Sequence, residues 1–168
     1  MVILDVGGRD EPFTEELFRY VDILSPNETE LIRVLGKKPK DQEEQDHEIE
    51  LFLRKYPHMK LLLKKGEFGS ALYFLEDPAD SQTTPIKLIT KPAYNFENFP
   101  GLKLVDTTGA GDCFTGAFAT EMLEGVGYES ALEFANKVGF LCITKFGAGP
   151  SIPSREDVEK VFGRKNQH

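Results

Sequence analysis

A glycine-rich bend that ends in an acidic residue is the part of this chain whose residue types most directly indicate chemistry. Residues 106–116 are Asp-Thr-Thr-Gly-Ala-Gly-Asp-Cys-Phe-Thr-Gly. The glycines let the backbone turn tightly and leave its N–H groups unshielded. The apolar residues that follow recur at helical spacing, at Phe114, Ala117, Phe118, Met122 and Leu123. The bend is therefore expected at a helix N-terminus, where unpaired N–H groups and the helix dipole bind an anion such as phosphate.

Asp112, the acidic residue of the bend, has two interpretations. An acidic side chain at the start of a helix is commonly an N-cap or a first-turn residue without any further role. A cap, however, requires neither two glycines flanking an alanine nor a second acid six residues earlier, at Asp106. The whole string favours phosphoryl transfer, which needs a carboxylate beside the nucleophile and donors aimed at the transferred group.

The same string resembles the C-terminal signature of the ribokinase-like (PfkB) carbohydrate kinase family. The resemblance implies that Asp112 is the general base that takes the proton from a sugar hydroxyl. It also implies that the amides of Gly109, Ala110 and Gly111 form an anion hole. The implied activity is ATP-dependent phosphorylation of a primary hydroxyl group, and the tail at residues 145–156, which is most similar to the ribokinases within the family, favours ribose.

A second segment, residues 27–30, resembles the Asn-x-x-Glu element of the family. The resemblance implies that Asn27 reaches the nucleotide phosphates and that Glu30 holds Mg²⁺, largely through water. One carboxylate is enough for such a site, because Mg²⁺ keeps several waters and also binds phosphate oxygens. Considered without the resemblance, Asn followed by Glu at this spacing is a helix capping box, and both roles can hold together.

A third segment resembles the nucleotide loop of the family, and it follows an expected strand directly. Its residues are Lys64, Lys65, Gly66, Glu67, Phe68 and Gly69. Considered alone, the segment is a turn between two strands. Many family members have Thr where this chain has Lys64, so the phosphate contact of that residue is left open.

Two weaker correspondences come from counting forward from Asp112. Asn136 falls where the family places a residue beside the adenine, although it could equally be a solvent-facing helix residue. The family's monovalent-cation loop, which holds an ion such as K⁺, corresponds to Asp106, Thr108, Cys142, Lys145, Gly147 and Ser151.

Composition limits the remaining functions. The 168 residues are 40% hydrophobic and 29% charged, which predicts one globular domain over residues 1–168. A net charge of −8 without a basic cluster argues against nucleic acids and anionic membranes as partners. Neither a membrane span nor a signal peptide is recognisable, so a cytoplasmic location is expected. Both cysteines are expected to be reduced, with Cys113 either a small buried side chain or a thiol of lowered pKa.

The order of apolar runs and turn residues predicts alternating strands and helices. Strands are expected at residues 1–6 (buried), 21–24, 60–63, 70–75 and 86–91. Helices are expected at residues 13–20, 27–35, from the charged run 37–47 to 56, after the glycine bend, at 128–144 and from 154. This order predicts an α/β class, a Rossmann-like three-layer α/β/α fold with a mostly parallel sheet and ligands at the carboxyl ends of the strands.

The resemblance covers the whole chain but corresponds to one half of the family fold, whose members have roughly 300 residues. It implies a C-terminal nucleotide-binding and catalytic half without the N-terminal sugar and lid half. An exposed strand edge and apolar face are then expected, with a possible homodimer through the sheet. The implied ligands are ATP or ADP and a small sugar. The alternative hypothesis is a truncated nucleotide-binding fragment or pseudo-kinase without sugar turnover.

Overall fold

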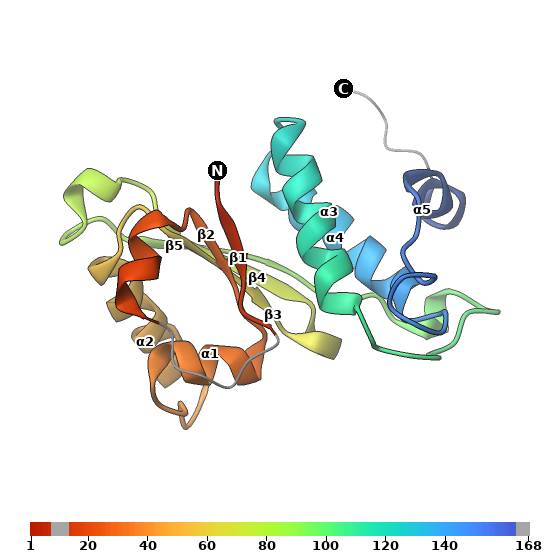
Figure 1. Ribbon diagram of the computed structural model, residues 1–168, viewed down its shortest axis with the longest axis horizontal. Helices are drawn as coiled ribbons and strands as arrows, with labels where there is room; N and C mark the ends of the chain where they lie inside the picture. Colours follow the sequence, from red (N-terminus) through yellow and green to blue (C-terminus); the bar gives the residue numbers. More distant parts are fainter. Residues whose placement is uncertain (8–13, 164–168) are drawn as a thin grey trace. The chain divides into compact units, whose positions relative to one another are not determined.

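The computed structural model describes residues 1–7 and 14–163, which form two compact units (Figure 1). Unit 1 comprises Met1–Gly66 and Ser70–Thr90, and unit 2 comprises Glu67–Gly69 and Lys91–His168. Gly8 and Phe13, which belong to the expected first turn and first helix, lie outside the described residues.

A five-stranded sheet forms the centre of unit 1. Its strands, in spatial order, are β1 (Ile3–Asp5), β2 (Ile23–Ser25), β3 (Lys60–Lys64), β4 (Ser70–Leu75) and β5 (Ile86–Lys91). The pairs β1/β2 and β2/β3 are parallel, whereas β3/β4 is antiparallel, so the sheet is mixed. The few residues between β3 and β4 explain this exception, because a parallel crossover needs a dozen residues or more.

Two helices pack on one face of this sheet. Helix α1 (Glu28–Leu35) begins after Asn27 and ends at Gly36, whose φ of 72° is left-handed, and α2 (Gln42–Lys55) begins after Asp41. Their apolar residues join one face of the strands in a core that includes Leu24, Leu31, Ile49, Leu53, Leu61 and Leu63. Because strand residues alternate between faces, Ile23, Leu62 and Leu72 lie on the other face. A sheet that is apolar on both faces is typical of three-layer α/β folds.

Two expectations for the first part of the chain were wrong. The segment expected as a helix at residues 13–20 is a 3₁₀-helix, η1 (Glu15–Tyr20), which buries only Phe18; so short a segment with one buried anchor gains little from α-helical propagation. The first strand is half-buried, and Met1 and Val2 before it are exposed. Its place explains this: β1 lies at an edge of the sheet, and β2 is its one neighbouring strand within the described ranges.

Helices dominate unit 2. They are α3 (Ala110–Leu123), α4 (Tyr128–Cys142) and α5 (Arg155–Phe162), and α3 packs closely against α4. Short 3₁₀-helices occur at η2 (Gly66–Phe68), η3 (Pro78–Asp80, in unit 1) and η4 (Phe96–Asn98). The segment that contains η4 is anchored by an aromatic cluster of Tyr94, Phe96, Phe99, Phe140 and Phe162, with ring centroids 4.6 to 6.1 Å apart. This cluster attaches the segment to α4 and α5.

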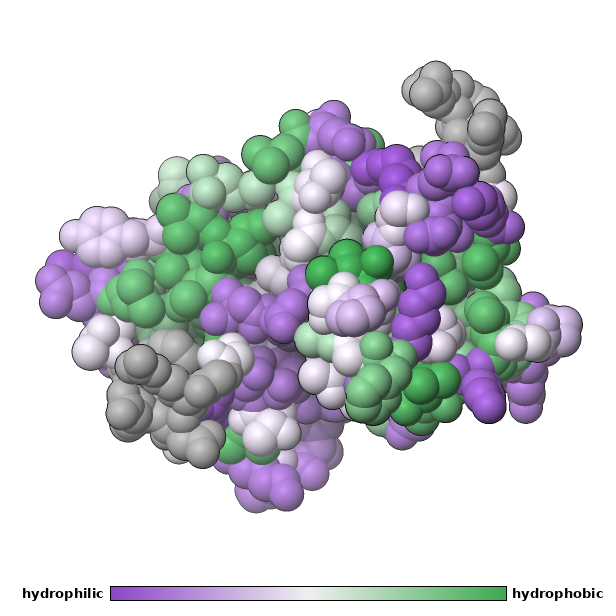
Figure 2. All heavy atoms as spheres, turned by 45° about the vertical axis from the view of Figure 1, so that its right-hand side comes forward, coloured by the Kyte–Doolittle hydropathy of each residue, from purple (hydrophilic) through white to green (hydrophobic). Residues whose placement is uncertain are grey.

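Large apolar side chains are also exposed, among them Leu123, Phe146 and Ile152. Figure 2 shows that apolar surface is interspersed with hydrophilic surface on the face in view. Within residues 1–7 and 14–163, no helix is long and apolar enough to cross a membrane.

Candidate active site

The glycine bend forms the N-terminus of α3, as the sequence predicted. Gly109 is the N-cap residue, with a φ of 80°. A Cβ atom there would lie 3.0 Å from Cβ of Ala148, so both the backbone conformation and the space favour glycine. Gly109 makes no side-chain cap, and the first regular helical hydrogen bond runs from N of Cys113 to O of Gly109 at 2.9 Å.

The amides that remain open are those of Gly109, Gly111 and Asp112. The N–H of Ala110 donates to O of Thr107 at 3.2 Å, but within the described part of the chain the N–H groups of Gly109, Gly111 and Asp112 find no backbone or cap acceptor. Such N–H groups, together with the helix dipole, attract an anion. Two of the three amides of the expected anion hole, those of Gly109 and Gly111, are therefore open, and so is that of Asp112, while the amide of Ala110 is partly engaged.

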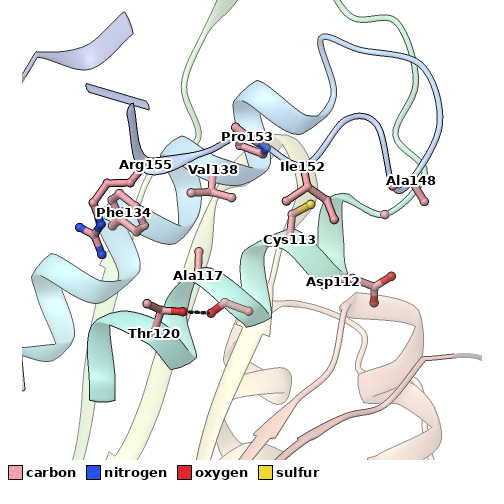
Figure 3. A pocket seen from close by; sticks show the side chains of 13 residues that line it. Asp112, Cys113, Ala117, Thr120, Phe134, Val138, Ala148, Ile152, Pro153 and Arg155 are labelled. Carbon is pink, nitrogen blue, oxygen red and sulfur yellow. Dashed lines mark hydrogen bonds between the residues drawn. The ribbon is translucent and has the colours of Figure 1, made fainter. Parts of the chain in front are cut away.

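The carboxylate of Asp112 is exposed beside these amides, and it makes no hydrogen bond or ion pair with any of the described residues. It lies at one end of a pocket of about 650 Å³, and Figure 3 shows Phe134 and Arg155 at the opposite end. An unpaired carboxylate at a helix N-terminus is free to accept a proton from a bound hydroxyl group.

The far end of the pocket is fixed by an ion pair and a ring contact. Nη2 of Arg155 lies 2.7 Å from Oε1 of Glu121, which is buried, and the guanidinium stands 4.6 Å from the ring centre of Phe134. These contacts hold the start of α5 against α3 and α4. They also engage the guanidinium, so Arg155 acts as a wall of the pocket.

Asp106 ties the bend to the loop after α4. Its Oδ1 accepts from N and Oγ1 of Thr108 at 2.9 and 2.6 Å, and its Oδ2 accepts from N of Gly147 at 2.9 Å. The Thr108 hydroxyl and amide and the Gly147 amide lower the pKa of Asp106. Both carboxylate oxygens are satisfied from within the protein, so the two loops stay joined without a bound ion.

The remaining residues of the expected cation loop lie close to this link, with one exception. Sγ of Cys142 is 3.1 Å from Oγ of Ser151 and 4.0 Å from O of Thr108, and both Cys142 and Ser151 are buried. Lys145 is exposed, and only its backbone N–H approaches the group, by donating to O of Cys142 at 3.2 Å.

Both cysteines are free thiols, as expected. Burial, with a smaller contribution from the neighbouring Cys142, raises the pKa of the Cys113 thiol to about 12. The interpretation of Cys113 as a thiol of lowered pKa was therefore wrong, and the small buried side chain is confirmed.

In unit 1, Asn27 and Glu30 form the capping box that their spacing predicted. Oδ1 of Asn27 accepts from N of Glu30 at 2.9 Å, and Oε2 of Glu30 accepts from N of Asn27 at 2.7 Å. The other carboxylate oxygen, Oε1, points toward Gly7, where an added Cβ would be 3.6 Å away. The cap thus fixes the direction of Glu30 and leaves one of its oxygens for another ligand.

Lys64 lies in the same part of the sheet and has a partner that the sequence analysis missed. Its Nζ is 2.7 Å from Oδ2 of Asp5, and a parallel bridge joins its backbone to Asn27. The carboxyl ends of β1 and β3 are therefore linked across the end of β2. The available signal was the place of Asp5 at the end of the first expected strand, because the ends of parallel strands meet at one edge.

The rest of the expected nucleotide loop is a turn between β3 and β4, as its alternative interpretation predicted. Nζ of Lys65 donates to Oε1 of Gln42 at 3.3 Å in unit 1. Gly66 and Gly69 have left-handed φ values of 52° and 93°. Phe68 is exposed, and Glu67–Gly69 belong to unit 2.

Asn136 is buried on α4, so its interpretation as a solvent-facing helix residue was wrong. Its Nδ2 donates to O of Lys91 and to O of Pro92, each at 3.2 Å. The side chain thus holds the segment that follows β5.

Comparisons with known proteins place these features in a family. The family model for the pfkB family carbohydrate kinases matches residues 1–155. The ribokinase of Arabidopsis thaliana is 41% identical over 161 residues, which cover 96% of this chain and 38% of that protein. The solved structure of Arabidopsis thaliana ribokinase complexed with ribose and ATP aligns over 98% of this chain and 48% of its own, with a TM-score of 0.78 and 38% identity. The ribokinase structure from Thermotoga maritima aligns over 98% of this chain and 49% of its own, with a TM-score of 0.73 and 29% identity.

The chain therefore belongs to the pfkB family of carbohydrate kinases and has the ribokinase-like three-layer α/β fold. The family resemblance drawn from residues 106–116 is confirmed. The chain spans about half the length of the structures it matches, between 48% and 49% of those two.

Proposed function

We propose that the chain carries the phosphotransfer centre of an ATP-dependent sugar kinase that acts on a primary hydroxyl group, with ribose as the favoured substrate. The observation that carries this proposal is the N-terminus of α3, where the exposed, unpaired carboxylate of Asp112 lies beside the open amides of Gly111 and Asp112. The ribokinase relatives, one of them solved with ribose and ATP, support the choice of sugar and nucleotide.

In the proposed reaction the hydroxyl oxygen of the sugar attacks the γ-phosphorus of ATP. The bond from that phosphorus to the bridging oxygen breaks and ADP leaves, while Asp112 takes the hydroxyl proton and later releases it to water. The open amides at the start of α3 donate to oxygens of the transferred phosphoryl group, whose charge they stabilise. Gly109 places these amides, because no other residue fits its φ and its contact with Ala148 as easily.

The proposed nucleotide ligands are Asn27, the turn residues Lys64 to Gly69, and Gly111. Lys64 contributes its ammonium group, whose position is fixed by the hydrogen bond of 2.7 Å from Nζ to Oδ2 of Asp5. The turn supplies backbone close to the phosphates, because its two left-handed glycines leave the N–H groups unshielded.

Mg²⁺ is proposed to bind with the nucleotide, and the residues present fit it. Oε1 of Glu30 is a hard oxygen that the capping box directs without occupying it. When bound, Mg²⁺ would neutralise part of the triphosphate charge. Three expectations remain predictions: a cytoplasmic location, a single domain over residues 1–168, and a site for a monovalent cation such as K⁺. The residues of that cation site are Asp106, Thr108, Cys142, Lys145, Gly147 and Ser151.

Replacing the proposed base tests the proposal. Asp112→Asn should lower the rate of ribose-dependent ADP release by about 10² to 10⁴, the usual contribution of a general base, while ATP affinity changes little. The matched control is Asp77→Asn, an exposed residue whose side chain caps the N–H of Ala79 and whose amide replacement can accept the same bond. Where the wild type shows ribose-dependent turnover, an equal rate in Asp112→Asn and in the control would refute the role of Asp112.

The alternative proposal is a nucleotide-binding fragment or pseudo-kinase without sugar turnover. One measurement distinguishes it from the kinase proposal: ADP release by the 168-residue chain with ribose, fructose or adenosine as the acceptor. Saturable release that depends on an acceptor supports the kinase. ATP binding without such release supports the fragment or pseudo-kinase.

Self-association is a further proposal and rests on β1. This strand lies at the edge of the sheet, and the apolar residues Met1 and Val2 before it are exposed. An unpaired edge can add a strand from a second copy. A monomer at all concentrations in sedimentation velocity would exclude such a homodimer.

A further inference from the structure

Both N–H groups of the Asn136 side chain donate hydrogen bonds to two consecutive backbone carbonyl groups. Its Nδ2 carries two hydrogens, and these are directed at O of Lys91 and at O of Pro92, each 3.2 Å away. The opposite amide orientation would place Oδ1 against both carbonyl oxygens, which is repulsive, so the hydrogen bonds fix the orientation. No amide hydrogen of Asn136 is left for a nucleotide base.

The two carbonyls belong to the stretch of backbone against which Gly69 packs. A Cβ atom on Gly69 would lie 2.1 Å from O of Lys91 and 2.6 Å from both C of Pro92 and N of Ala93. No side chain fits at that distance, and Gly69 also has a left-handed φ of 93°. Residues 91–93 therefore lie in direct contact with the backbone of the turn Glu67–Gly69, within the same unit.

Asn136 lies on a tightly packed part of α4. Helix α4 packs along α3, and Ala135 next to Asn136 is fully buried. Asn136 itself is only 9% exposed. Lys91 ends β5 and Pro92 follows it outside the sheet, and the carbonyl groups of both accept from Asn136.

From these contacts we infer that Asn136 is a positioning residue, which clamps residues 91–93 so that they in turn hold the turn Glu67–Gly69. This inference rests on the proposed function, because it makes Asn136 act on nucleotide binding through that turn. A residue that contacts the adenine would favour ATP over GTP. A residue that only positions the turn should affect the affinities for both nucleotides equally.

Asn136→Asp tests the clamp with the smallest change in shape. It places a carboxylate oxygen against the two carbonyl groups, so residues 91–93 should move away and release the turn. Amide hydrogen exchange in the peptide that covers Gly66–Ser70 should become about tenfold faster in the protein without ligand, as the loss of two modest hydrogen bonds implies. The affinities for ATP and for GTP should fall by a common factor of about ten, with their ratio preserved.

The control is Asn98→Asp, which makes the same change of atoms and charge in the same unit. Asn98 is exposed, and its side chain makes no hydrogen bond with any of the described residues. This variant should match the wild type in exchange and in both affinities. Asn136→Ala serves as a second variant that removes the two donors without adding charge, and it should show the same effects as Asn136→Asp.

Two results would overturn the inference. One is unchanged exchange over Gly66–Ser70 in both Asn136 variants, and the other is an ATP-to-GTP affinity ratio that shifts by more than about threefold, which indicates a direct base contact. Failure of the proposed function is a different result. In that case the wild type itself does not bind ATP, while the exchange measurement still decides whether Asn136 holds the turn.

Discussion

The carboxylate of Asp106 shows how one side chain can set the position of a catalytic element. It accepts hydrogen bonds from Thr108, just before the bend, and from Gly147, in the loop after α4. Those donors favour its charged form and lower its pKa. The group therefore stabilises the fold fully above its unfolded pKa of about 4, and it loses this contribution as the pH falls through the lower folded value.

The pH dependence of stability tests this link. Asp106→Asn should lower the free energy of unfolding by the same amount from pH 8 to pH 5. Its difference from the wild type should shrink below about pH 4, where the carboxylate becomes protonated first in the unfolded chain and then, at lower pH, in the folded protein. Urea unfolding at a series of pH values measures it. Thr108→Val, which removes one of the three donors, should show a smaller effect of the same form. A difference that stays constant down to pH 3 would contradict the link.

Residue roles could be predicted where they depend on neighbours in the sequence. The capping box of Asn27 and Glu30 was predictable because its two members are three residues apart. The pair of Lys64 and Asp5 and the contacts of Asn136 were not, since their partners lie 59 and about 45 residues away. Contacts of that kind depend on how the elements pack, which residue types alone do not determine.

At the scale of elements, two glycines, one before α3 and one within it, have opposite effects on the stability of the fold. Gly109 has a left-handed φ of 80° and almost touches Ala148, whereas a Cβ atom on Gly116, inside the helix, would meet nothing within 4 Å. The first glycine is required by geometry. The second only reduces helix propensity.

Alanine at each position should reveal this difference. Gly109→Ala should reduce the free energy of unfolding by about 1–2 kcal/mol or more, from the left-handed backbone and the crowding at Ala148. Gly116→Ala should increase it by up to about 1 kcal/mol, because alanine is the better helix former. Urea unfolding of both variants and of the wild type measures the sign of each change in the free energy of unfolding. Stabilisation by Gly109→Ala would be incompatible with the geometry of the bend.

Most elements were predictable because their ends carry local signals. Asn27 and Gly36 bound α1, and Ser154 caps α5, as their types indicate. The 3₁₀ form of η1 was not predictable, because the apolar spacing of so short a segment fits both kinds of helix. The antiparallel β3/β4 pair could have been inferred from the short turn at residues 65–69.

At the scale of the whole molecule, the order of strands and helices was sufficient to predict the fold class. The division into two units was not predictable, because it depends on which segments contact each other most. The turn Glu67–Gly69 illustrates this. It begins only three residues after β3 ends, yet it belongs to unit 2, where Gly69 contacts residues 91–93.

Nucleotide binding should be visible in the stability of the entire chain. A ligand that binds only the folded state at 100 times its dissociation constant stabilises a protein by about 2.7 kcal/mol. For a chain of this length that is a rise of roughly 5–10 °C in the unfolding temperature. The net charge of −8 opposes the approach of a polyanion, so the rise at a fixed ATP concentration should be larger with Mg²⁺, which neutralises part of the triphosphate charge.

Thermal unfolding with ATP, with ATP and Mg²⁺, and with adenosine measures this effect. Adenosine is the control because it carries the base and ribose but has no phosphate for the open amides of Gly111 and Asp112. It should therefore raise the unfolding temperature less than ATP does at the same concentration. Equal shifts with adenosine and ATP would show that the phosphates gain nothing from the N-terminus of α3, and the proposed anion hole would then have to be abandoned.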